Sequence, residues 1–215
     1  CMNMSKEARG RIGIGSVGEN ESVDEIVRRA ERIKSDRFVL VAPYGYAGAV
    51  AGLISRLNYY ESPTFKTLSG VWELSKRYTP SEIRKLIKAG VLVLDYHKER
   101  GVIVVKGIAT SGEQISVTRI VDHAVRGVKS IADSFIGTLN TPAGRLALRE
   151  KLREFLIRME REGAIVPSTD LKEPAFLVDV YCSELDFAQG IVRVDLAIRP
   201  VRAIDYIYAT ILVQI

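Results

Sequence analysis

The sequence is poor in the residues that build metal centres and covalent cross-links. It has two cysteines and two histidines, and Cys1, Cys182, His97 and His123 show no metal-ligand spacing. Two cysteines in a chain of 215 residues are also too few for a disulfide framework. We therefore expect no metal, no other cofactor and no disulfide, and we interpret Cys182, in an apolar strand-like run, as a buried thiol.

Long apolar runs are missing as well. The longest are far shorter than the roughly 20 residues that span a membrane, and no run near the start has the order of a signal peptide. These absences predict no membrane insertion and, by default, a cytoplasmic protein. A chain of 215 residues that is 47% apolar suits one large domain or two small ones, with ample material for a core.

The charge is mildly basic and evenly spread. The formal net charge is +5, but lysine and arginine alternate with glutamate along most of the chain. A nucleic-acid-binding protein is expected to gather its basic residues in one stripe with aromatic residues between them. The mixed pattern instead predicts a solvated surface and no nucleic-acid partner. An acidic protein partner is the alternative.

Local signals predict both helices and strands. Residues 1–35 are expected to be a flexible segment, irregular to residue 21, followed by an amphipathic helix, and residues 36–215 the main domain. Capping signals and apolar faces predict helices at about 22–35, 79–89, 116–136 and 142–162, with a short one within 44–57. Apolar or alternating runs predict strands at 38–42, 91–96, 102–105, 175–183, 191–198 and 204–215, of which 91–96 and 102–105 form a hairpin.

Residues 13–18, Gly-Ile-Gly-Ser-Val-Gly, spell a GxGxxG motif. In a dinucleotide site these glycines follow a strand and open directly into a helix, whose first amides bind the phosphates. Here residues 6–10 are a poor strand and the helix begins only at Ser22, while Glu19 and Glu21 place negative charge where a phosphate would lie. We interpret the segment as a flexible linker. The alternative is a nucleotide-binding enzyme that uses residues 13–18.

No other pattern points to catalysis. His123 follows Asp122 on a predicted helix, where adjacent side chains point about 100° apart, and His97 lies in the predicted hairpin turn. The chain has no nucleophile elbow, P-loop or His-Glu-x-x-His motif. We therefore predict that the protein is not an enzyme.

Two features point to contacts with other molecules instead. The terminal run Ile204–Ile215 is rich in β-branched and aromatic residues and has no charge after Asp205. Such a strand is a liability unless it lies inside its own sheet or adds to the sheet of a neighbouring chain. On the helix at 142–162, Arg145, Arg149 and Arg153 recur every four residues, either as a solvated stripe or as a docking site for an acidic partner.

The order of these elements, with several local phrases, resembles the C-terminal region of contractile tail sheath proteins from phages, R-type pyocins and contractile injection systems. The similarity covers about residues 36–215, while the first 35 residues match nothing in that family pattern. Sheath proteins are usually much longer, so an N-terminal portion is expected to be missing or reduced. The phrases include Ala42–Gly52, Ser62–Lys66, Leu68–Val71, Thr79–Gly90, Gly107–Thr110, Val117–Ile120, Phe135–Gly137 with Asn140, Phe155–Ile165 and Arg199–Ile207.

The resemblance implies an α/β (α+β) fold with a mixed sheet flanked by helices. It implies a sheath-type domain that assembles with its own copies into helically stacked six-fold rings around an inner tail tube, on a baseplate. It implies assembly in the cytoplasm and a place in a phage tail or injection particle. Contraction would drive the tube through a target envelope by a rigid-body rearrangement and without a cofactor; a scaffold that never contracts would have the same sequence features. The resemblance also assigns Arg145, Arg149 and Arg153 to tube docking, and a linking strand to Ile204, Tyr206, Tyr208, Thr210 and Leu212.

Overall fold

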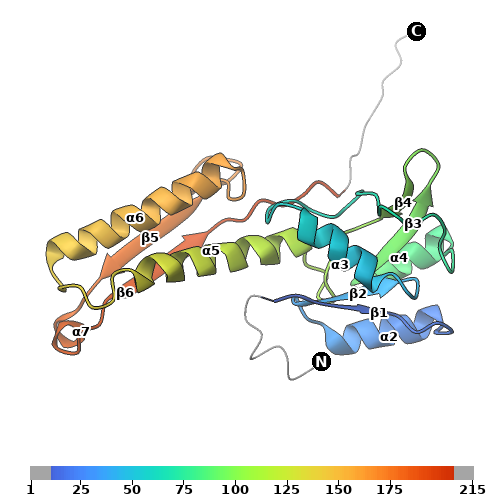
Figure 1. Ribbon diagram of the computed structural model, residues 1–215, viewed down its shortest axis with the longest axis horizontal. Helices are drawn as coiled ribbons and strands as arrows, with labels where there is room; N and C mark the ends of the chain where they lie inside the picture. The colour runs from blue at the N-terminus through green and yellow to red at the C-terminus, as the bar shows by residue number, and fades with distance from the viewer. Residues whose placement is uncertain (1–10, 206–215) are drawn as a thin grey trace, which may run out of the picture. The chain divides into compact units, whose positions relative to one another are not determined.

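The computed structural model describes residues 11–205, which separate into two compact units (Figure 1). The first unit contains the chain up to Ser116 and resumes at Arg202, and the second consists of Val117–Val201. The boundary expected near residue 35 therefore lies inside the first unit, and the stretch expected as one main domain is shared between both units.

The first unit is built on a mixed four-stranded sheet. Its strands are β1 (Gly13–Ser16), β2 (Phe38–Ala42), β3 (Val91–His97) and β4 (Gly101–Val104), in that order across the sheet. The first three strands are parallel, and β3 pairs with β4 in the antiparallel hairpin that the sequence predicted. The expected α/β fold with a mixed sheet is thus confirmed.

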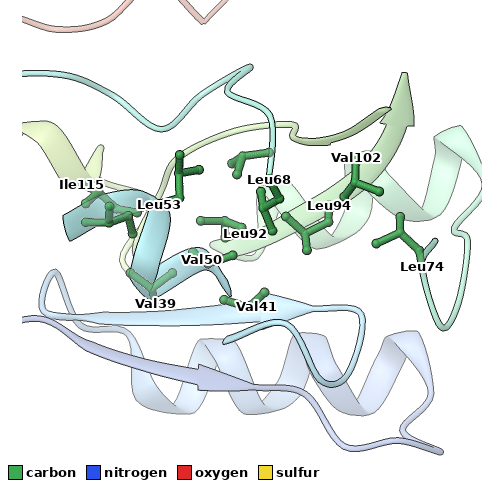
Figure 2. Packing of buried hydrophobic residues seen from close by; sticks show 12 residues of the cluster. Val39, Val41, Val50, Leu53, Leu68, Leu74, Leu92, Leu94, Val102 and Ile115 are labelled. Carbon is green, nitrogen blue, oxygen red and sulfur yellow. The ribbon is translucent and has the colours of Figure 1, made fainter. Parts of the chain in front are cut away.

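Helices cover both faces of this sheet, and the strand pattern shows why. Val39 and Val41 of β2 pack in one cluster with the buried side of α3 (Ala47–Arg56), as Figure 2 shows. Their neighbours Leu40 and Ala42 point to the opposite face, in a cluster with α2 (Val23–Ile33) and α4 (Pro80–Lys88). Because both faces are buried, the strand is apolar at every position rather than alternating.

The second unit combines long helices with a two-stranded hairpin. Helix α5 (Ile115–Asp133) begins at the end of the first unit, and α6 (Pro142–Arg161) runs along the hairpin of β5 (Phe176–Tyr181) and β6 (Arg193–Ile198) (Figure 1). The short helix α7 (Glu184–Ala188) connects these two strands. The core stripe of α6 is Leu148, Leu152, Leu156 and Met159. Among residues 11–205, no helix has the length and apolar character needed to cross a membrane.

The structure corrects two expectations. Residues 13–16, expected to be irregular, form β1 and pair with β2. The Cys182 thiol is only partly buried, with its sulfur 3.2 Å from the carbonyl oxygen of Ile191. Ile204 and Asp205 pair with no strand of this chain, and the expected part of Ile204 in a strand that links neighbouring chains stays a prediction. The remaining residues of the expected linking strand, Tyr206, Tyr208, Thr210 and Leu212, lie outside the described residues.

Candidate interaction surfaces

The glycine-rich segment has a packing role on the edge of the sheet. The ring of Phe38 covers Gly13 and Gly15, so that a Cβ atom at Gly15 would lie 2.8 Å from the ring. The N–H of Gly18 donates to the carboxylate of Glu21 at 2.7 Å, and Arg29 pairs with the same carboxylate. The expectation of a flexible linker was therefore wrong. The glycines make room for an aromatic ring, and a glutamate takes the amide that a phosphate would need.

The two histidines lie in separate structural settings. The ring of His97, at the end of β3, packs edge-on against Phe65, and its Nδ1 accepts a hydrogen bond from the N–H of Glu99 at 3.3 Å. His123 packs against Phe155, and burial together with the charge of Arg126 lowers its pKa. No three His, Cys, Asp or Glu side chains within residues 11–205 are placed to hold a metal ion.

Asp186 has the largest change in pKa among the carboxylates of the second unit, and its cause is structural. Hydrogen bonds from Arg193 and then from Ser183 lower its pKa from 3.8 to about 2. Through Ser183 the carboxylate closes the capping box of α7, and through Arg193 it ties this helix to the start of β6. This ion pair fixes the end of the hairpin and keeps the Asp186 carboxylate in structural contacts.

The arginines expected to form one stripe on α6 differ in their surroundings. Arg145 is half-buried and donates a hydrogen bond to the side-chain oxygen of Asn140 at 2.7 Å. Arg149 is exposed and lines a shallow groove together with Asp179 of β5. Arg153 is also exposed, in a groove formed by other residues of α6 itself. Arg149 and Arg153 are thus available to a partner, whereas Arg145 supports the turn before α6.

The β5–β6 hairpin presents an open surface. Its strands alternate between half-buried residues, on one face, and exposed residues, such as Leu177, on the other. Asp179 lies directly opposite Asp195 on the exposed face, a pairing of like charges that destabilises an isolated hairpin. Within the described part of the chain, neither strand pairs with a further strand. The unpaired backbone edges are suited to the addition of another strand.

One exposed aromatic residue was not predicted from the sequence to take part in a contact. Trp72, the single tryptophan, is 89% exposed on a loop of the first unit. The hydroxyl of Tyr46 holds this loop, because it accepts a hydrogen bond from the N–H of Ser75 and donates one to the carbonyl of Glu73, both at 2.8 Å. A large aromatic side chain on a fixed loop is suited to anchor a contact between proteins. The local sequence carried no such signal, since the contacts that hold the loop come from Tyr46.

Comparison with protein families gives a match over half of the chain. The model of the phage tail sheath protein central domain matches residues 1–110. This match includes the first 35 residues, which the resemblance seen in the sequence had left unassigned. No curated protein matches the chain.

Three solved structures with a similar fold are sheaths or sheath proteins. The sheath of an extracellular contractile injection system (PVC) in its contracted state has a TM-score of 0.78, with 14% identity over 92% of this chain and 62% of that chain. The contracted helical sheath of the anti-feeding prophage has a TM-score of 0.69, with 18% identity over 83% of this chain and 56% of that chain. A sheath tail protein from Listeria innocua has a TM-score of 0.69, with 14% identity over 94% of this chain and 48% of that chain. The chain therefore spans less than two thirds of these solved chains, and the identities show a shared fold.

Proposed function

Because this chain belongs to the phage tail sheath protein family, we propose that it is a structural subunit of a contractile sheath. The observation that carries the proposal is the family match over residues 1–110, together with a fold likeness that extends over 92% of the chain. In this role the subunit assembles with its own copies into helical six-fold rings around an inner tube, joins a baseplate and drives the tube outward when the array contracts. The role is structural and needs no cofactor.

The β5–β6 hairpin supports a specific mode of linkage between subunits. Its strand edges are unpaired within the described residues, and its exposed face carries apolar Leu177 beside the Asp179–Asp195 pair. We propose that a strand from a neighbouring subunit adds to this hairpin, and that the segment with Ile204, Tyr206, Tyr208, Thr210 and Leu212 supplies it. Backbone hydrogen bonds then keep subunits joined while they rotate as rigid bodies.

Electron microscopy of the purified chain, with light scattering on the same sample, tests the proposed function. Hollow tubes or stacked six-fold rings are the expected result. Trp72 provides a second readout, because a residue that is 89% exposed shifts its emission to shorter wavelength if assembly buries it. A chain that stays monomeric up to its solubility limit would contradict self-assembly.

We propose that Arg149 and Arg153 of α6 dock an acidic face of the inner tube, and charge reversal at these positions tests this contact. We expect Arg149→Glu with Arg153→Glu to weaken co-assembly with an acidic tube surface by about tenfold or more, since attraction becomes repulsion at two exposed positions. Arg145→Glu is the matched structural variant, because this side chain bonds Asn140 and its reversal should mainly lower stability. Co-sedimentation with the tube at several salt concentrations measures the effect, and unchanged co-assembly of the double variant would remove the claim.

A further inference from the structure

A single glutamine side chain holds the chain where it returns from the second unit. Gln114 is only 5% exposed, and its side-chain amide forms hydrogen bonds with both the N–H and the carbonyl of Ala203. The Oε1 atom accepts from the N–H of Ala203 at 2.8 Å, and Nε2 donates to the carbonyl of Ala203 at 3.0 Å. The Nε2 group also donates to Asp205 at 2.9 Å. Gln114 thus takes the place that a neighbouring strand would occupy in a ladder.

Two ion pairs flank this glutamine contact. The guanidinium of Arg202 binds both carboxylate oxygens of Glu113, at 2.8 and 3.0 Å. The Nζ atom of Lys106 lies 3.1 Å from the carboxylate of Asp205, and these side chains are 21% and 14% exposed. The Lys106–Asp205 pair is therefore largely shielded from water and interacts more strongly than a surface pair, whereas the Arg202 side chain is 64% exposed. The three contacts therefore act on Arg202, Ala203 and Asp205, three residues of the segment 202–205.

The residues just before this segment have different partners. The carbonyl of Arg199 accepts from the N–H of Val166 at 3.0 Å, and the N–H of Val201 donates to the carbonyl of Ala164 at 2.9 Å. These partners belong to the second unit, whereas Lys106, Glu113 and Gln114 belong to the first. Between Val201 and Arg202, the chain therefore passes from contacts with the second unit to contacts with the first.

We infer that Lys106, Glu113 and Gln114 form an anchoring site that fixes the outgoing C-terminal segment to the first unit rather than to the second. The consequence of this anchoring rests on the proposed function. A neighbouring copy that pulls on the terminal segment transmits the force directly to the first unit, which contains the four-stranded sheet. The β5–β6 hairpin, on the second unit, would receive strands without carrying the load of the subunit's own segment.

Hydrogen exchange of single backbone amides in the full chain tests this assignment. In Gln114→Ala, the amide of Ala203 should exchange about tenfold faster or more, because it loses its acceptor. The amide of Val201, which bonds Ala164, should be unchanged, and the amide of Val105, which bonds Val93, reports that the first unit remains folded. Unchanged exchange at Ala203, or equal acceleration at Val201, would overturn the inference.

A charge swap supplies a second, independent measurement. Glu113→Arg should speed hydrogen exchange of the Ala203 amide, because the new arginine repels Arg202. Adding Arg202→Glu to this variant should return the exchange rate of the Ala203 amide close to that of the wild type. A double variant that exchanges as fast as the single one would show that this pair does not anchor the segment. Exchange is measured on the dispersed chain, so that failure to form tubes would count against the proposed function and leave this measurement intact.

Discussion

Replacing Tyr208 and Thr210 with proline in the full chain is expected to abolish tubes and rings at concentrations where the wild type forms them. Proline has no backbone N–H and is excluded from the interior of a sheet, so both substitutions remove ladder bonds from the proposed linking strand. We expect the critical concentration for assembly to rise by at least about tenfold. Light scattering across a concentration series, followed by electron microscopy, measures this change.

The matched control is the double substitution of Tyr208 and Thr210 by valine. Valine keeps the amide and favours strands, so assembly should persist if backbone pairing is what links the subunits. The thermal transition of the proline variant should equal that of the wild type, because every buried hydrophobic residue within residues 11–205 lies before Val201. Normal tubes from the proline variant would contradict the linkage by strand addition.

The sequence predicted those parts of the fold that local chemistry determines. Ser22 with Glu25 forms the expected capping box, and Thr79 is the expected cap before Pro80, because each of these signals is complete within four residues. Glu82 completes a second capping box at Thr79 that was not predicted. The apolar run of β2 was recognised as a buried strand, since burial on both faces leaves no polar position. The family resemblance, also read from ordered local phrases, was confirmed by the family match over residues 1–110.

Features that depend on distant residues could not be predicted in this way. The glycines of β1 looked like a linker because their cause, the ring of Phe38, lies on the neighbouring strand. The spacing of Arg145, Arg149 and Arg153 correctly placed them on one helix, but it could not reveal that Asn140 binds the first of them. The contact between Gln114 and Ala203 joins residues 89 positions apart, and neither residue type signals it.

Two glycines that look alike in the sequence differ in the distant residues that surround them. Gly90 follows α4 and Gly112 lies in a later turn, and both have left-handed backbone angles, with φ of +85° and +88°. A Cβ at Gly112 would meet no atom within 4 Å, so Gly112→Ala should cost only the left-handed backbone strain of about 1–2 kcal/mol. A Cβ at Gly90 would lie 2.5 Å from the carbonyl oxygen of Thr110.

Gly90→Ala is therefore expected to destabilise the first unit by about 3–5 kcal/mol, since overpacking adds to the same backbone strain. Thr110 cannot move aside easily, because its N–H donates to the carbonyl of Phe38 at 2.8 Å and its hydroxyl bonds both backbone groups of Ser35. Urea unfolding followed by circular dichroism measures both variants. Equal losses for Gly90→Ala and Gly112→Ala would mean that Thr110 moves aside, and that its bonds to Phe38 and Ser35 do not hold it in place.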